Sequence, residues 1–352
     1  MIARKSSKIR IGISLGDLNG IGPEVILKTL EDNRINDLCI PIIYASTKTI
    51  NYYLKSLGIQ NFNFDLIKDA TQFKTKNACL INLWDEEVNI NPGQEDLISG
   101  KYAAISLKAA AKDLKEGHID ALVTGPINKH SIQSDEFNFP GHTEFLQNLD
   151  EAEDSLMLML SEHARIGVIT GHIPVKDISK NINSDVILKK ISILNKSLKE
   201  DFQIRRPKIA VLGLNPHAGD NGLLGDEEKN IIEPAINQAK SIDILAFGPY
   251  PADGFFGSDN YRNYDGILAM YHDQGLIPAK SFSFGAGVNF TSGLSFIRTS
   301  PDHGTAYSIA GQGIANEGSF RKAIYTAIEI AKNRLLKAEL EQDALPINKN
   351  RS

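Results

Sequence analysis

Short apolar runs alternate with longer stretches of helical periodicity along this chain, and that alternation limits the fold more than any other feature of the sequence. Such runs are typical of buried strands, and strands that alternate with helices build βαβ units and a largely parallel sheet. We therefore expect an α/β protein. The predicted strands are residues 9–15, 39–44, 78–83, 121–124, 156–160, 166–170, 209–214, 244–247 and 267–271, and the predicted helices are residues 23–30, 101–116, 185–198, 227–240 and 320–340.

The size and charge of the chain exclude several classes of protein. At 352 residues it is long for a single hydrophobic core, so we expect two domains. The net charge of −5 argues against a nucleic-acid-binding surface, and no apolar run approaches the roughly 20 residues that span a bilayer. Cys39 and Cys79 lie in apolar runs, which indicates core residues in a reducing compartment. We expect a cytoplasmic protein that binds neither nucleic acid nor membrane.

Three histidines, His172, His217 and His272, each come within three residues of the end of a predicted strand. In open α/β proteins ligands bind beyond the carboxyl ends of the strands, and three imidazoles there would suit a catalytic divalent metal. The histidines lie 45 and 55 positions apart, so no local ligand motif supports this hypothesis, and an ordinary structural role for each stays open. Three other histidines lack this context and are expected to be structural or surface residues: His118, His130 and His163.

The loop that joins the first predicted strand to its helix, residues 16–24, is rich in glycine. Glycines there permit a tight turn and let an anionic ligand approach the amides at a helix N-terminus. The dinucleotide fingerprint Gly-x-Gly-x-x-Gly is missing, since residues 285–287 lack the third glycine. Gly100-Lys101 is followed by Tyr102, which excludes a P-loop. A nucleotide would therefore bind outside the Rossmann and P-loop schemes.

Several polar loops contain His, Lys, Asn and Arg in addition to the Gly and Pro that turns require. Five of them match one known family in the right order: residues 124–129, 139–146, 215–219, 271–280 and 298–306. On these residues the chain resembles the 4-hydroxythreonine-4-phosphate dehydrogenases, NAD-dependent enzymes of pyridoxal 5′-phosphate biosynthesis. The resemblance extends from Gly16 to about Ala315, which is nearly the whole chain.

The resemblance implies a two-domain α/β/α fold like that of the isocitrate and isopropylmalate dehydrogenases, without a Rossmann fingerprint. Residues 20–25 and 303–316 are similar to segments of those enzymes. One domain is then discontinuous and consists of residues 1–130 and 290–352, with the cofactor loops. Residues 131–289 form the second domain, with the metal ligands and the dimer interface. The active site is expected in the cleft between the domains.

The resemblance also implies roles for individual residues. The metal ligands are His172, His217 and His272, in a site shared by the two subunits of a homodimer. The substrate-binding residues are His142, Thr143, Lys280, Asn289 and Arg298. The cofactor-binding residues are His303, Gly304, Thr305 and Ala306. The cofactor is NAD, with NADP as the alternative, and each active site holds one divalent ion, which is zinc, magnesium, cobalt or manganese.

These residue types suit the reaction that the resemblance implies. Oxidation of 4-phosphooxy-L-threonine by NAD gives a β-keto acid, which decarboxylates to 3-amino-2-oxopropyl phosphate. A metal on the hydroxyl oxygen lowers the pKa of that hydroxyl and stabilises the enolate-like oxyanion that follows. Lys280 or Asp253 is the candidate proton acceptor. Asp273 is expected to orient His272 rather than to act directly, because the two are adjacent.

Three other functions stay open on the sequence. The first is dehydrogenation of 4-phosphoerythronate or 4-phosphothreonate in sugar-acid catabolism, which uses the same metal and hydride chemistry. The second is a catalytically silent binding protein, which predicts a missing histidine or a missing Lys280, whereas all of these residues are present. The third is a metal-dependent aldolase or hydrolase, which has no use for the cofactor segment at residues 303–316.

Overall fold

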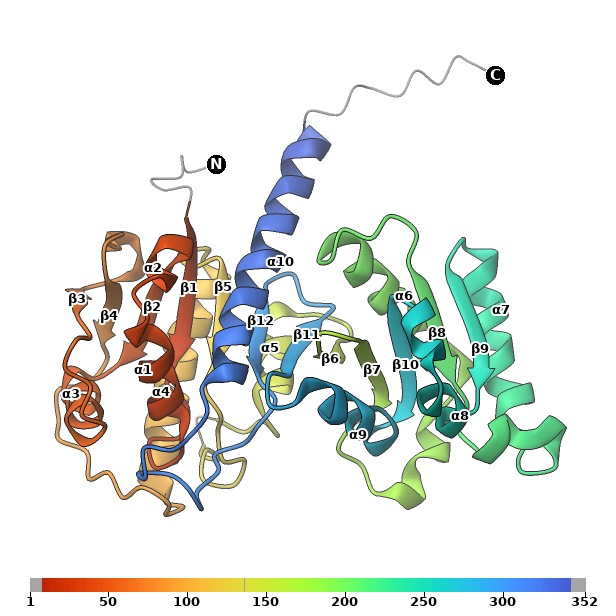
Figure 1. Cartoon of the computed structure of the whole chain (residues 1–352), viewed down its shortest axis with the longest axis horizontal. Helices are drawn as coiled ribbons and strands as arrows, with labels where there is room; N and C mark the ends of the chain where they lie inside the picture. The colour runs from red at the N-terminus through yellow and green to blue at the C-terminus, as the bar shows by residue number, and fades with distance from the viewer. Residues whose placement is uncertain (1–7, 136, 343–352) are drawn as a thin grey trace.

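One twelve-stranded sheet runs through the residues that the computed structural model describes, 8–135 and 137–342 (Figure 1). Its strand order is β3-β4-β2-β1-β5-β12-β11-β6-β7-β10-β8-β9. The strands are β1 (Ile9–Ser14), β2 (Cys39–Ala45), β3 (Phe64–Ile67), β4 (Ala78–Asn82), β5 (Ala121–Thr124), β6 (Leu156–Leu160), β7 (Arg165–Thr170), β8 (Lys208–Leu212), β9 (Leu245–Tyr250), β10 (Gly266–Tyr271), β11 (Val288–Ser292) and β12 (Arg298–Pro301). All nine predicted strands are present, and the α/β class is confirmed.

Helices connect most of these strands. The α-helices are α1 (Gly22–Glu31), α2 (Ile35–Leu38), α3 (Thr47–Ser56), α4 (Leu97–Lys115), α5 (His142–Asp150), α6 (Ser184–Glu200), α7 (Glu233–Ser241), α8 (Ala252–Gly257), α9 (His272–Ser283) and α10 (Gly318–Gln342). Shorter helical turns are η1 (Ala70–Gln72), η2 (Val175–Asp177), η3 (Ser179–Asn181), η4 (Pro216–Gly222), η5 (Glu228–Ile232) and η6 (Asp259–Asn263). Local chemistry sets several starts: Pro23 lies in the first turn of α1, and the Asp96 and Asn183 side chains cap α4 and α6.

The flanks of the sheet are parallel, and its centre is antiparallel. β3, β4, β2, β1, β5 and β12 run parallel to one another, and so do β7, β10, β8 and β9. Between these flanks β11 is antiparallel to both β12 and β6, and β6 is antiparallel to β7. Antiparallel neighbours need only short connections, and β6–β7 and β11–β12 have them. Eight of the eleven strand pairings among the described residues are parallel, so the prediction of a largely parallel sheet is confirmed; the antiparallel centre was not predicted.

Several elements were not predicted from the sequence, and for β3, β11, β12 and α9 the reason can be identified. β11 and β12 were not predicted because their sequences, VNFTS and RTSP, are largely polar and contain no apolar run. α9 was taken as a loop because it contains Gly275 and Pro278, which are unfavourable inside helices. Gly275 is needed there, since a Cβ at that position would lie 2.7 Å from Cγ1 of Val168 on β7. β3 is a short edge strand with little buried surface, so it gives a weak apolar signal.

The apolar core is continuous on one face of the sheet and interrupted on the other. The first face packs against α1, α6, α7 and α10 in one large cluster. On the second face α4 and α5 cover one flank and α8 and α9 cover the other, in two separate clusters. The interruption falls on the central strands β11 and β12. The candidate site described below lies at this interruption.

The strands of residues 1–130 and β12 occupy one flank of the sheet, and β6 to β10 occupy the other. β11 straddles the predicted boundary at residues 289 and 290, and the division into two domains stays a prediction. Cys39 and Cys79 are both buried and free, as expected for small core residues. Among the helices within the described ranges, none combines the length and the hydropathy of a membrane span.

Candidate active site

Polar side chains project from the central strands on the face that lacks a covering helix, and they form the floor of a cavity of about 280 Å³. Asn289 of β11 and Arg298 and Ser300 of β12 lie beside Met157 and Met159 of β6. Successive side chains of a strand point to opposite faces. The residues that alternate with these five along their strands therefore point away from the cavity and pack against α6 and α10. The alternation of β11 and β12 therefore turns Asn289, Arg298 and Ser300 toward the cavity, while Phe290 and Thr299 point to the opposite face.

The walls of this cavity come from segments that follow β5, β7, β10 and β12. Three wall residues of α9, His272, Leu276 and Lys280, are four positions apart and therefore share one face of the helix. The remaining wall residues are Gly125, Pro126, Ile127, Lys129, Gly141, His142, His172, Pro301, Asp302, His303 and Gly304. The structure thus brings together most of the residues predicted to bind substrate and two of the three predicted metal ligands.

Arg298 is a buried charge on the cavity floor. Its side chain donates from Nε and Nη2 to Oγ1 of Thr124, at 3.1 and 2.8 Å, and from Nη1 to Oγ1 of Thr291, at 3.2 Å. Within the described ranges it forms no ion pair with a carboxylate. Burial lowers the pKa of Arg298 to about 10, although Glu144 opposes this shift. A desolvated guanidinium bonded only to neutral hydroxyls is stabilised by an anion from outside the chain, so the floor predicts an anionic ligand.

His172 and His272 lie together on the wall, with their ring centroids 5.3 Å apart. Burial lowers the pKa of His172, and the nearby Lys129 and His272 add to this effect. The neutral imidazole is the form that binds a metal. Nδ1 of His272 lies 2.7 Å from Oδ1 of Asp273, a contact that leaves Nε2 available to a metal. The donor set of this pair therefore fits a divalent ion, and Asp273 makes the contact that an orienting role requires.

His217 lies apart from this pair. It is exposed on η4 and does not line the cavity. Residues 217–221 all have positive φ, from 42° to 78°, which is uncommon for residues other than glycine. The buried carboxylate of Glu228 holds the start of this turn, accepting from the amides of Leu214 and Asn215 at 2.8 and 2.7 Å. One chain therefore gathers two of the three predicted metal ligands and leaves the third at its surface.

Another group of potential metal ligands lies elsewhere. Within the described part of the chain, one trio of His, Cys, Asp or Glu side chains has its ligand atoms within 4.8 Å of one another: Asp113, Glu116 and His118. This trio lies at the C-terminal end of α4 and lines no wall of the cavity. Its acidic members already accept other contacts, since Asp113 binds the hydroxyl of Tyr44 at 2.6 Å.

Three buried polar atoms of the predicted site have no hydrogen-bond partner among the described residues: Nε2 of His142, Oδ1 of Asn289 and Nε2 of His303. A buried polar atom without a partner is costly, so these atoms mark positions that a bound ligand or water would satisfy. All three residues line the cavity. The unpaired atoms lie on three different elements, so a ligand that satisfies all three would touch the floor and two walls.

Besides His217, five residues of the predicted site do not line the cavity: Thr143, Asp253, Asp273, Thr305 and Ala306. Asp253 is exposed on α8, so within a single chain it is not placed to exchange a proton with a molecule in the cavity. Thr305 packs closely against Gly20. A Cβ added at Gly20 would lie 3.0 Å from the Cβ of Thr305. The cofactor segment thus contacts the cavity through His303 and Gly304.

The glycine-rich loop at residues 16–24 does not have the role that its sequence suggested. The entire loop is buried, and its amides are already bonded: Asp17 donates to the carbonyl of Pro126, and Ile21 donates to the carbonyl of Thr305, both at 2.9 Å. Gly16 has φ of +77°, and a Cβ there would lie 2.4 Å from the oxygen of Pro126. The glycines permit close packing of loops, and the expectation of an anion site on this loop is wrong.

The sequence analysis did not single out Lys129 and Asp302, which both line the cavity. Nζ of Lys129 lies 3.5 Å from Nδ1 of His172. Asp302 accepts from the hydroxyl of Ser319 at 3.0 Å and so links β12 to α10. The signal for Lys129 was present, because it closes the polar segment at residues 124–129 directly after a buried strand.

Neutral histidines in this cavity are expected to make stability depend on pH. Burial holds the pKa of His142 well below 6.5, and Arg298 and Lys129 lower it further. Below pH 6.5 the unfolded chain therefore binds more protons than the folded chain, so the free energy of unfolding falls as the pH falls. Each such group contributes a slope of up to about 1.4 kcal/mol per pH unit. Urea unfolding at about pH 7.5 and about pH 5.5 measures this slope.

Two variants test the assignment of this slope. His142→Asn removes one titrating group and should make the stability of the protein less sensitive to acid. The matched control is His163→Asn, because His163 is exposed and lies outside the cavity. Equal acid sensitivity in the wild type and the His142→Asn variant would contradict the assignment.

Comparison with known proteins bears on this cavity directly. The model of the family described as "Pyridoxal phosphate biosynthetic protein PdxA" matches residues 37–327, which include the floor and almost every wall of the cavity. This chain belongs to the PdxA family.

Relatives of the PdxA chain agree with this assignment. This chain is 50% identical over 331 residues to the 4-hydroxythreonine-4-phosphate dehydrogenase of Bacteroides thetaiotaomicron. The alignment covers 94% of this chain and 91% of that protein. A crystal structure of 4-hydroxythreonine-4-phosphate dehydrogenase from Klebsiella pneumoniae matches with a TM-score of 0.82 at 34% identity, covering 93% and 99% of the two chains. A protein of Oceanobacillus iheyensis, provisionally named D-threonate 4-phosphate dehydrogenase, is 38% identical to this chain over 335 residues. The alignment covers 94% of this chain and 100% of that protein. These names make the PdxA chain a dehydrogenase.

Proposed function

We propose that this PdxA chain oxidises 4-phosphooxy-L-threonine with NAD. The carbon that bears the hydroxyl gives a hydride to the nicotinamide, and the hydroxyl gives its proton to a base. The resulting β-keto acid loses CO2, takes up a proton and becomes 3-amino-2-oxopropyl phosphate. The observation that carries this proposal is Arg298, a desolvated cation without a carboxylate partner on the floor of the cavity that also holds His172 and His272.

Cations of the chain itself account for substrate binding. Arg298, Lys280 and Lys129 line the same cavity, and within the described residues none of the three forms an ion pair with a carboxylate. The substrate carries two anionic groups, a phosphate and a carboxylate, which suit a guanidinium fork and the point charges of two lysines. His142 and Asn289 each hold an unpaired buried atom that can bond the substrate's polar groups. The cavity thus selects a small molecule that is anionic at more than one position.

Lys280 is the proton acceptor that the geometry favours. It lies on the same face of α9 as His272 and lines the cavity, whereas Asp253 of the same chain does not.

His172 and His272, together with His217 from a second copy of the chain, are proposed to hold one divalent metal in a homodimer. The metal would polarise the substrate hydroxyl and stabilise the oxyanion that forms when CO2 leaves. Two observations support sharing: the cavity of one chain contains only two of the histidines, and the third is exposed on η4. Imidazole ligands suit zinc, and cobalt, manganese and magnesium are the alternatives.

NAD is proposed to bind next to the segment at residues 303–306. His303 and Gly304 follow β12 directly and line the cavity, so a nicotinamide there would face a substrate held by Arg298. Nδ1 of His303 contacts the carbonyl of Gly304 at 3.0 Å, while its Nε2 is buried and unpaired. NADP is the alternative cofactor.

The experiment follows NADH formation by metal-loaded enzyme with three substrates side by side: 4-phosphooxy-L-threonine, 4-phosphoerythronate and D-threonate 4-phosphate. We expect the amino substrate to be favoured in kcat/KM by at least about tenfold, since a site built to bind an amino group rejects analogues that lack it. A chelator should abolish the turnover, and added zinc should restore it.

The outcomes separate the candidate functions. Preference for D-threonate 4-phosphate or 4-phosphoerythronate would favour the sugar-acid function, which the Oceanobacillus iheyensis relative represents by its name. Turnover that is unaffected by the chelator would contradict the metal site. Absence of turnover with all three substrates, in the presence of metal and NAD, would contradict the proposed oxidation.

A further inference from the structure

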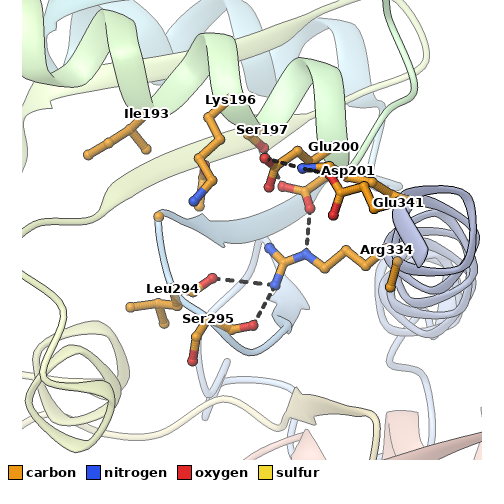
Figure 2. Close-up of a pocket in the computed structure, with 13 residues that line it drawn as sticks. Ile193, Lys196, Ser197, Glu200, Asp201, Leu294, Ser295, Arg334 and Glu341 are labelled. Carbon is orange, nitrogen blue, oxygen red and sulfur yellow. Dashed lines mark hydrogen bonds and ion pairs between the residues drawn. The ribbon is translucent and has the colours of Figure 1, made fainter. Parts of the chain in front are cut away.

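A second cavity, of about 380 Å³, lies on the other side of the central strands (Figure 2). Its walls are α6, α10 and the turn between β11 and β12. None of its lining residues lines the substrate cavity. The polar residues that matter below are Lys196 and Glu200 of α6, Ser292 of β11, and Arg334 and Glu341 of α10.

Ser292 supplies a buried hydroxyl to this cavity. The residue is 0% exposed, and its Oγ has no hydrogen-bond partner among the described residues. Thr291, the preceding residue of β11, accepts from Arg298 on the substrate face, so Ser292 projects from the opposite face of the strand. An unpaired hydroxyl inside a cavity has a cost that a bound polar group would remove.

Two cations of this cavity also have unused donors. Arg334 donates from Nε to Oδ1 of Asp201 at 2.6 Å and from Nη1 to the carbonyl of Ser295 at 2.8 Å. Its Nη2 donates to no group in the described part of the chain. Lys196 likewise has no ion pair or hydrogen bond there, and Figure 2 shows it extending from α6 toward the β11–β12 turn. Three donors, two of them charged, are thus available to an acidic group.

Carboxylates occupy the other side of the same cavity. Glu200 and Glu341 both contact Lys337, at 2.6 and 3.4 Å, and each does so through one oxygen, Oε1. The second oxygens of these carboxylates remain available to a positively charged group. Figure 2 shows Lys196 and Glu341 on opposite sides of the pocket, so the two ends of one ligand could each meet a side chain of opposite charge.

We propose that this cavity binds a small zwitterion with an acidic group at one end and an ammonium group at the other. The acidic group contacts Lys196, Ser292 and Nη2 of Arg334, and the ammonium group faces Glu200 and Glu341. The volume suits a compound of the size of an amino acid or a phosphorylated amino acid. Both kinds of compound carry an acidic group and an ammonium group, and the experiment below distinguishes them. The inference does not rest on the proposed substrate or on the metal.

The experiment is a calorimetric titration of the whole protein with O-phosphoserine, with serine and inorganic phosphate as the comparison probes. We expect two classes of site for O-phosphoserine, because the substrate cavity also accepts an anion. Lys196→Ala should weaken one class by about tenfold or more, and Ser292→Ala should weaken the same class, since each removes a donor to a charged group. Arg298→Met should weaken the other class. The matched control is Lys199→Ala, an exposed lysine of α6 that does not line this cavity.

Each outcome decides the inference. The inference would be overturned if O-phosphoserine showed no class of site that Lys196→Ala weakens by more than about twofold, whether one class or two are seen. If inorganic phosphate binds this class of site as tightly as O-phosphoserine and serine do, the cavity is a plain anion site and not a zwitterion site. Serine that binds as well as O-phosphoserine would identify an amino acid rather than its phosphate ester. Failure of Arg298→Met to weaken the other class would count against the proposed substrate site alone.

Discussion

Replacing Arg298 with methionine is expected to lower kcat/KM by about 30-fold to 1,000-fold without unfolding the protein. Loss of a buried, charged contact to a ligand costs about 2–4 kcal/mol, which corresponds to this range. The folded chain loses only hydrogen bonds to the hydroxyls of Thr124 and Thr291, and it no longer has to bury an unpaired charge. The melting temperature should therefore stay the same or rise. Initial rates of NADH formation and a thermal melt measure both effects.

The matched control for this variant is Arg165→Met. Arg165 is also partly buried, and burial lowers the pKa of its guanidinium too, but the residue lies at the start of β7 and does not line the cavity. Its guanidinium packs over the ring of Phe202 at 4.7 Å, so the control variant should lose stability and keep its activity. An Arg298→Met enzyme with activity within about threefold of the wild type would show that the floor does not hold the substrate's anion.

Two inactive variants are expected to restore activity to each other if the metal site is shared. His172→Ala and His217→Ala should each be inactive as a homodimer, because every site lacks one ligand. In a heterodimer of the two, one site combines the intact His172 and His272 of one chain with the intact His217 of the other. Random pairing makes half of the dimers mixed, with one working site of two, so co-expressed chains should show about a quarter of the wild-type activity.

The control for this experiment pairs His172→Ala with His272→Ala. These two residues line the same cavity within one chain, so no pairing of the two variants assembles a complete site. This mixture should stay inactive under the same conditions. If the mixture with His217→Ala also stays inactive while the mixed dimers form, the three histidines do not meet across a subunit interface.

The sequence predicted the elements whose residue pattern is set mainly by burial of apolar side chains. The nine predicted strands are mostly apolar because they are buried on both faces, as Ile11 and Ile42 illustrate on β1 and β2. The long helices have apolar faces and recognisable starts, such as the Asp96 cap of α4. The positions of His172 and His272 after strands were predictable for the same reason, because a strand that is easily identified also locates the residue that follows it.

Elements that serve both the core and the site were harder to predict. Asn289 and Arg298 lie in strands, but their polarity made those strands look like loops, because one face of β11 and β12 forms the cavity floor. The glycines of residues 16–24 looked like a ligand-binding turn, and only the backbone of Pro126 and Thr305 reveals that they serve packing. In the proposed site, His217 would meet the other two histidines only through a second copy of the chain, and no pattern within one sequence gives the distances between two chains.

The lack of helix cover over β11 and β12 also has a mechanical consequence. A sheet backed by helices on both faces resists bending, whereas these two strands pack against α6 and α10 on one face only and form a compliant seam between two stiffer flanks. The substrate cavity lies across this seam, with Arg298 at its centre and His172 on one flank. We therefore expect a change in the twist of these strands to pivot one flank against the other and to open or close the cavity, with no hinge in a loop.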